Sequence, residues 1–233
     1  WKIRASVAAS QHLNRFEIDG QTVESSLSSR RAGGLVVKSL NEHWSVGAYF
    51  SLTSSSYANI RSEVNTAPAV EFDLFPYAQA TRRQLRFLYR LNFSAVRYRE
   101  ETIYLKTRES LWNESLTVSL ELKEKWGTVS ASLEGAHYFH DLAKSRLNLS
   151  GEVSLRLYKG LSFDIFGGGS RIRDQLSLPR AGASYEDILL MRKQLATSYE
   201  YFFSVGLSYA FGSIFSNVVN PRFGEGGLAY GLY

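Results

Sequence analysis

The stretch RLNLSGEVSLRL, residues 146–157, alternates strictly between polar and apolar side chains. Its odd-numbered positions carry five aliphatic residues and a glycine, and its even-numbered positions carry Arg146, Glu152, Arg156 and three small polar residues. Because successive side chains of an extended strand point to opposite faces, this stretch predicts a strand with one apolar and one charged face. In a soluble sandwich or a lipocalin-like barrel the apolar face would line a core or a cavity. In a membrane barrel it would face lipid.

Composition narrows the choice of fold. The 233 residues are enough for one large all-β domain, and no apolar run approaches the roughly 18 residues that a membrane-spanning helix needs. There is no cysteine, so no disulfide framework exists, and the net charge is +5. The first residues, WKIRASVA, already follow the alternating pattern, which leads us to expect an upstream segment.

The same alternation returns along the whole chain and predicts ten antiparallel strands. No helical stripe of comparable length occurs, so we predict an all-β chain. The predicted strands cover residues 1–18, 22–40, 43–58, 64–77, 82–104, 110–124, 126–141, 144–158, 161–177 and 190–212.

The predicted connections alternate in length. Short ones fall at 40–43, 76–81, 124–127 and 158–160, and longer polar ones fall near 17–26, 56–65, 99–113, 139–146 and 175–192. Membrane barrels have short periplasmic turns at one end and longer extracellular loops at the other. The pattern therefore places both termini in the periplasm.

Two hairpins test the strand register on paper. A two-residue turn at 125–126 would set Leu122 opposite Val129 and Glu121 opposite Ser130, so apolar meets apolar and polar meets polar. A connection ending near Gly160 would keep Arg156 on the same face as Asp164.

Aromatic residues gather towards both ends of the predicted strands. Two such belts flanking an aliphatic band are typical of a barrel that crosses a bilayer. The short-turn belt comprises Trp44, Phe75, Tyr77, Trp126, Tyr158 and Phe211. The long-loop belt comprises Tyr57, Tyr98, Tyr104, Trp112, Tyr138, Phe139 and Tyr199.

These patterns together predict a transmembrane antiparallel up-and-down β-barrel over residues 1–212, with about ten strands in this chain. Residues 213–233 are expected to form a C-terminal periplasmic tail. A lipocalin-like soluble barrel is the alternative, since tyrosine and phenylalanine favour strands in any setting.

Charged side chains on the polar faces are the candidate functional residues, and we expect them to line the lumen. Because isolated buried charges are costly, they should pair across the lumen and fill a narrow barrel; a polar pore for ions is the second reading. The predicted lumen-lining residues are Glu71, Asp73, Arg86, Arg90, Glu121, Lys123, Arg146, Glu152, Arg156 and Asp164, with Lys2 and Arg4 sharing their face.

Other chemistry has little support in the sequence. The basic run RRQLRFLYR, residues 82–90, places Arg82, Arg86 and Arg90 on one face of a strand whose other face is apolar, which is poor geometry for binding nucleic acid. No metal-ligand set emerges and no cofactor motif is present, because the triple glycine at 167–169 opens no helix. Asp141 beside His140, and Asp174, are the only hints of acid–base catalysis.

Four stretches carry a family resemblance: RRQLRFLYR (82–90), WGTVSASLEG (126–135), RIRDQLSLP (171–179) and residues 192–223. The chain resembles a group of uncharacterised bacterial outer-membrane barrel proteins over nearly its whole length. This resemblance implies that the chain is the C-terminal portion of a longer barrel of twelve strands. It implies no activity and no site residues.

The expected function is therefore non-enzymatic: a structural or assembly subunit of the bacterial outer membrane, in contact with outer-membrane lipid. An envelope partner could dock on the 175–192 loop or on the tail. A narrow porin-like channel is the second hypothesis, and an outer-membrane hydrolase is the third.

Overall fold

The computed structural model describes residues 1–18, 21–184 and 192–209. These residues form one antiparallel sheet with a single short 3₁₀ helix, η1 (Tyr77–Gln79), and no α-helix in the described part. The predicted all-β chain of ten strands is confirmed. The strands are β1 (Lys2–Ile18), β2 (Gln21–Ser39), β3 (Trp44–Ser55), β4 (Ile60–Asp73), β5 (Arg83–Tyr98), β6 (Arg108–Glu124), β7 (Gly127–Tyr138), β8 (Asp141–Tyr158), β9 (Leu161–Ile172) and β10 (Tyr199–Tyr209).

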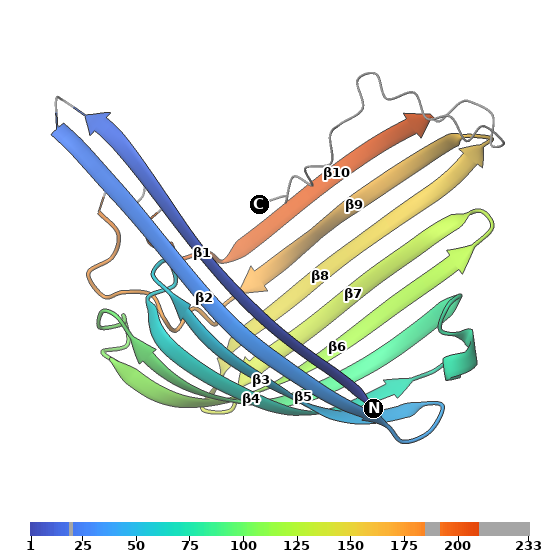
Figure 1. Cartoon of the computed structure of the whole chain (residues 1–233), viewed down its shortest axis with the longest axis horizontal. Coiled ribbons are helices and arrows are strands. Elements are labelled where there is room, and N and C mark those ends of the chain that lie inside the picture. Colours follow the sequence, from blue (N-terminus) through green and yellow to red (C-terminus); the bar gives the residue numbers. More distant parts are fainter. Residues whose placement is uncertain (19–20, 185–191, 210–233) are drawn as a thin grey trace.

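Each strand pairs with its sequence neighbours, so the topology is up-and-down. The sheet curves into a trough, with the β1–β2 hairpin rising on one side and β9–β10 on the other (Figure 1). The strand order begins at β1 and ends at β10, and these two edge strands do not pair with each other. A closed barrel was expected, and the described strands form an open one-layer sheet.

The two faces of the sheet differ as the alternation predicts. On β3, Trp44, Val46 and Phe50 are 44%, 38% and 45% exposed, while the alternate residues Ser45, Gly47 and Tyr49 are half-buried. The polar face is concave, because residues from five successive strands, β1 to β5, line one hollow on it. The apolar side chains therefore lie on the convex face.

Register agrees with both hairpins worked out above. Leu122 pairs with Val129 and Glu121 with Ser130 across a two-residue turn. In the β8–β9 hairpin, Arg156 pairs with Ser162 and so shares the face of Asp164. Gly160 turns this hairpin with a φ of 78°, a left-handed conformation that glycine adopts without strain.

The predicted alternation of loop lengths is wrong. The connection expected to be long near 56–65 consists of residues 56–59 alone, and the one expected to be short near 76–81 spans residues 74–82. Two further connections expected to be long are tight. Strands β1 and β2 pair as far as Ile18 and Gln21, and β7 and β8 are joined by Phe139 and His140 alone. In both places the polar residues assigned to loops continue the hairpin ladder instead. This is possible because ladder hydrogen bonds satisfy the backbone whether the side chains are polar or apolar.

The β9–β10 connection, residues 173–198, is long as predicted. Its first part, residues 173–184, crosses the concave face at the long-loop end and is called the crossing segment below. Leu176 of this segment is buried in a small apolar cluster with Val96, Tyr98 and Leu111. Ile60 and Tyr138 pack against the cluster.

The crossing segment corrects two members of the predicted long-loop belt. Tyr98 is 6% exposed and Tyr138 packs against the same cluster, so both rings face the crossing segment on the concave side. Trp112 and Phe139 are exposed, at 48% and 47%. At the short-turn end Trp44, Trp126 and Tyr158 are exposed. Phe211 and the 213–233 tail lie outside the described residues.

Close approach of β2 and β3 requires glycine at position 47. A Cβ on Gly47 would lie 2.6 Å from the carbonyl oxygen of Val36, whereas a Cβ on Gly34 would meet nothing nearer than 3.9 Å. We therefore expect G47A to lower the free energy of unfolding by about 1–3 kcal/mol, because the two strands must move apart. We expect no loss from the matched variant G34A. Urea unfolding followed by gel mobility measures both, and equal effects would contradict the strand spacing described here.

Candidate functional site: the polar concave face

The structure places all ten predicted lumen-lining residues on the concave face. Register links them from strand to strand: Asp73 pairs with Arg86, Gln84 with Glu121, and Ser130 with Glu152. Lys2 and Arg4 also belong to this face, since both line the hollow formed by β1 to β5. Because the described sheet is open, the enclosure of this face in a lumen stays a prediction.

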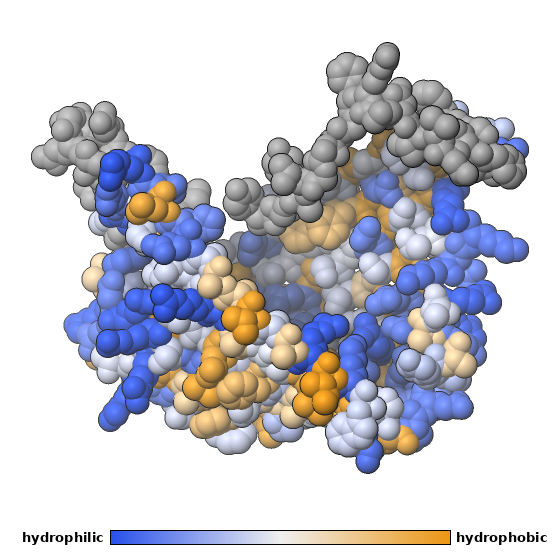
Figure 2. All heavy atoms as spheres, in the orientation of Figure 1, coloured by the Kyte–Doolittle hydropathy of each residue, from blue (hydrophilic) through white to orange (hydrophobic). Residues whose placement is uncertain are grey.

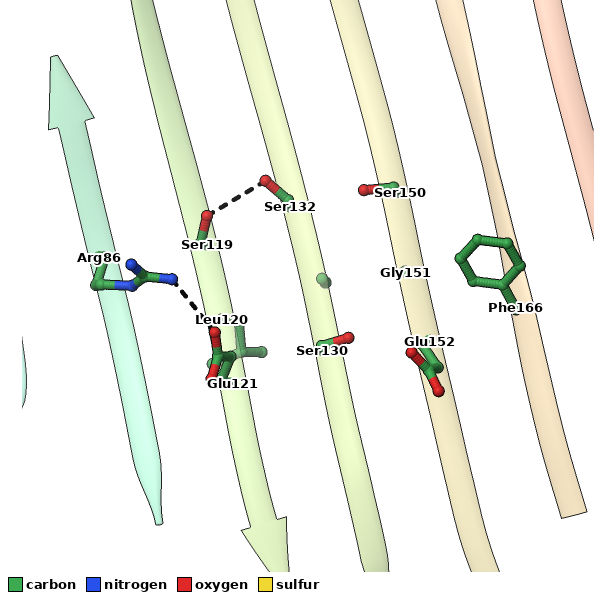
Figure 3. Close-up of a pocket in the computed structure, with 11 residues that line it drawn as sticks. Arg86, Ser119, Leu120, Glu121, Ser130, Ser132, Ser150, Gly151, Glu152 and Phe166 are labelled. Atoms are coloured by element: carbon green, nitrogen blue, oxygen red, sulfur yellow. Dashed lines mark hydrogen bonds and ion pairs between the residues drawn. The ribbon is translucent and has the colours of Figure 1, made fainter. Parts of the chain in front are cut away.

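Arg86 is the centre of the first ion-pair group. Its guanidinium lies 3.2 Å from Glu121 on β6 and 4.0 Å from Glu71 on β4, so it bridges two neighbouring strands. Figure 3 shows Arg86 and Glu121 among the serines of β6 and β7, with Ser119 and Ser132 hydrogen-bonded at 3.2 Å. Small hydroxyl side chains leave room here for the long charged ones.

Arg90 forms the second group. Its guanidinium donates to Glu134 of β7 at 2.7 Å, reaching across β6, and Thr117 on β6 donates to the same carboxylate at 3.1 Å. Arg90 also lies 5.8 Å from the ring centre of Tyr49 on β3. Glu134 was not among the predicted lumen-lining residues. Its even-numbered position, which it shares with Ser130 and Ser132, already indicates in the sequence that it lies on the polar face.

The third group ties the crossing segment to the sheet. Arg146 on β8 holds both carboxylate oxygens of Asp174 at 3.0 Å. Asp174, one of the two hints of catalysis, is therefore the partner of a predicted lumen arginine. Such a two-point contact fixes orientation as well as distance.

Asn59 fixes the far end of the crossing segment. Its side-chain amide donates to the carbonyl oxygens of Ser177 at 2.8 Å and Glu100 at 3.1 Å, and its own carbonyl accepts from the Glu100 amide. Asn59 is 5% exposed and has a φ of 58°, a left-handed conformation that asparagine tolerates.

Backbone contacts extend the crossing segment over the 99–107 loop. Thr102 forms a β-bridge with Pro179, and the Ile103 amide donates to the Leu178 carbonyl at 2.9 Å. The segment thus covers the concave face at its long-loop end, from β8 to β4.

The remaining predicted residues make fewer contacts. Asp73 accepts from the backbone amides of Phe75 and Leu85, each at 3.3 Å. Lys123, Glu152, Arg156 and Asp164 form no ion pair with any described residue.

Hollows lie along the concave face of the described sheet. One of about 690 Å³ is lined by residues of β1 to β5, including Lys2, Arg4 and Glu71 together with the apolar Leu35 and Leu88. A smaller one of about 270 Å³ lies between Arg86 and Phe166 (Figure 3). Both linings combine charged, small polar and apolar side chains.

One aromatic pair interrupts the polar concave face. The rings of Phe166 and Phe202 lie 5.0 Å apart, and a Cβ on Gly168 would come within 3.0 Å of the Phe202 ring. The triple glycine at 167–169 thus leaves space for an aromatic side chain and the adjoining strands. Glycine in a strand allows such a close approach, because it has no side chain to occupy the space.

The catalytic hints in the sequence correspond to structural contacts. Asp141 accepts a hydrogen bond from the Ala143 amide within its own turn. His137, rather than His140, contacts a carboxylate: its Nε2 lies 2.9 Å from Glu114. Ser145 pairs with His137 across β7 and β8, and its hydroxyl is directed to the Ala143 carbonyl. The Ser145 hydroxyl is thus directed to the backbone, and the His137 imidazole is directed to Glu114.

No group of three or more metal-ligating side chains occurs among residues 1–18, 21–184 and 192–209. Within the same residues, no helix has the length and apolar character to cross a membrane. Comparisons with known proteins give no match: no family model fits the chain, and no curated protein or solved structure is similar to it. The outer-membrane family resemblance therefore stays a prediction.

The Arg90–Glu134 pair offers a direct test of concave-face pairing. Its side chains are 25% and 30% exposed, whereas those of the Arg82–Glu124 pair at the short-turn end are 74% and 39% exposed. We expect a double-mutant cycle with R90M and E134Q to give a coupling of about 1–3 kcal/mol in unfolding free energy. The R82M/E124Q cycle should give less than about 1 kcal/mol, because water screens that pair. Equal couplings would count against a sheltered concave face.

Proposed function

We propose that the chain is an integral outer-membrane β-barrel protein with a structural role and an interior closed at the long-loop end. The observation that carries this proposal is the exposed apolar convex face. Leu149, Leu133 and Val205 are 56%, 43% and 52% exposed on three different strands, and no described element covers them. Exposed apolar side chains occur on this face from β1 to β10, with the His137–Glu114 ion pair among them, and a surface of this kind suits hydrocarbon better than water.

Strand lengths support the same setting. A tilted strand needs about 9–11 residues to cross the hydrocarbon core. Strands β1, β2 and β8 have 17, 19 and 18 residues, so they are long enough to cross it and extend into water. In the β1–β2 hairpin, the described side chains beyond Ala9 are mostly polar on both faces, as an aqueous extension requires.

Closure is the finer part of the proposal. Unpaired backbone groups are too costly in hydrocarbon, so a membrane-embedded sheet has to close. We propose that β1 and β10 are completed by strands beyond those described, in agreement with the twelve strands expected from the family resemblance.

The crossing segment favours a structural role over a channel. It covers the concave face at one end through the Arg146–Asp174 pair, the Leu176 cluster and the Asn59 contacts. The paired charges around Arg86 and Arg90 fill part of the space below it. A barrel of ten to twelve strands with these contents has little room for a free aqueous path.

The direction of the convex face can be tested with adjacent residues. We expect L149R to impair assembly in the outer membrane, because an arginine facing mid-bilayer lipid costs about 2–4 kcal/mol. The matched variant N148R puts the same side chain on the concave face, where its position pairs with Glu134, and should assemble normally. Heat-modifiable gel migration of membrane fractions measures assembly. Normal assembly of L149R together with failure of N148R would reverse the two faces.

Conductance tests the closed interior. The intact protein, with the strands that closure of the sheet requires, should show no steady openings in a planar bilayer. L176E/L178E should produce them, because two carboxylates would expel the crossing segment from its apolar cluster. L142E is the control, since Leu142 is exposed at the same end and outside that cluster. Steady ohmic openings of the intact protein would establish the channel hypothesis in place of the structural one.

A further inference from the structure

Five exposed arginines form a row at the long-loop end, four of them on the convex face and Arg61 in the bulge beside them. On β5, Val96 and Tyr98 are both 6% exposed on the concave side, so Arg97 between them points outward. Arg108 on β6 shares the alternation of the exposed Trp112, and Arg30 on β2 shares that of Val36. The row, called the arginine row below, comprises Arg30, Arg61, Arg97, Arg99 and Arg108, all of them exposed.

Register brings these residues side by side. Arg97 pairs directly with Arg108 on one side and with Ser62 on the other, and Arg61 lies in the bulge beside Ser62. Arg99 donates to Ser54 of β3 at 3.3 Å, and Ser54 pairs with Arg30 of β2. The row thus crosses β2 to β6. With strands about 4.8 Å apart, its length is about 19 Å.

No described carboxylate balances this charge. None lies within 4.0 Å of any of the five guanidinium groups. The nearby acidic residues are engaged elsewhere: Glu100 with Lys193, Glu101 with Arg180, and Glu109 with the Tyr98 hydroxyl on the concave side. Like charges placed directly opposite each other destabilise a sheet, so the Arg97–Arg108 pair favours an anion from outside the chain.

The position of the row indicates which anion. It borders the exposed apolar side chains Leu52, Val64 and Trp112, and Trp112 packs 4.9 Å from Phe93. Figure 2 shows the change from apolar surface in the lower middle to hydrophilic surface at the left, the long-loop end. In the proposed membrane setting this boundary lies at headgroup depth, where aromatic belts occur. Guanidinium groups contact phosphate oxygens in pairs, and a 19 Å row can contact several phosphates at once.

We propose that the arginine row binds the phosphates of a multiply phosphorylated glycolipid in the leaflet at the long-loop end. The inference rests on the proposed function, since only a membrane-embedded barrel presents the row to that leaflet. The Arg97–Arg108 pair is its centre, because there two guanidinium groups stand directly opposite each other and can share one phosphate.

The test measures binding of diphosphorylated lipid A to the full chain. Protein assembled in phosphatidylcholine vesicles is titrated with lipid A, and only the heat-modifiable, assembled fraction is scored. Each basic residue near an anionic surface contributes about a fivefold factor in affinity. We therefore expect R97A/R108A to bind about 25-fold more weakly. The control K125A/K159A removes the same charge from two exposed turns at the opposite end and should bind normally.

Further arms identify the ligand and the role of the pair. Phosphatidylglycerol, which carries one phosphate, should bind to the protein more weakly than lipid A does. Inorganic phosphate should displace lipid A only in the millimolar range or above. R97K/R108K should keep most of the affinity. Without lipid A, R97A/R108A should melt at the same or a higher temperature, because a repulsion has been removed.

Unchanged lipid A binding by R97A/R108A, or equal loss in K125A/K159A, overturns the inference, as does equal binding of phosphatidylglycerol. A lower melting temperature of R97A/R108A without lipid would show a structural role of the pair and also overturns it. Failure of the proposed function has a different signature: no variant, nor the unaltered chain, would reach the heat-modifiable assembled state.

Discussion

The structure depends on one constraint, the fixed alternation of side chains in strands that pair without interruption. Because each strand is locked in register to its sequence neighbours, the face of a few side chains determines the face of all the others. A slip by one residue in any hairpin would turn leucines inward and arginines outward on the whole following strand. The pairings of Leu122 with Val129 and of Arg156 with Ser162 show the register held at two tight turns. The chain has few fully buried apolar residues, so this two-face order takes the place of a conventional core.

The polar face meets this constraint by pairing charges. Arg86, Arg90 and Arg146 each contact a carboxylate on another strand or on the crossing segment. Such pairs add little net stability when compared with apolar packing, but removal of one partner leaves a sheltered charge alone. They therefore specify which strands lie near one another across the concave face. The reach of Arg90 over β6 to Glu134 requires both side chains to lie on the same face of the sheet.

The sequence was sufficient for strand number, order and facing, since each depends on period-two patterning within one strand or across one tight turn. It failed where contacts come from far along the chain. Tyr98 and Tyr138 were assigned to an outer belt because aromatic rings near strand ends suit an interface. They face inward because Leu176, distant in sequence, covers them. Loop lengths near 17–26 and 139–146 were overestimated. Polar side chains indicate exposure to water, but the backbone of such residues can still form the hydrogen bonds of a strand pair. Closure of the sheet depends on whether its two edge strands pair, and the alternation of side chains within a strand carries no information about that.

The two faces also differ in how their charges are compensated. The chain has 27 basic and 22 acidic residues, and the arginine row contains five basic residues without a described carboxylate partner. On the concave face, Arg86, Arg90 and Arg146 are paired, whereas Lys123 and Arg156 have no described carboxylate within 4.0 Å. Sheltered charges are poorly screened, whereas exposed charges can be neutralised by ions of the surroundings. The exposed position of the arginine row is therefore what allows it to carry uncompensated charge.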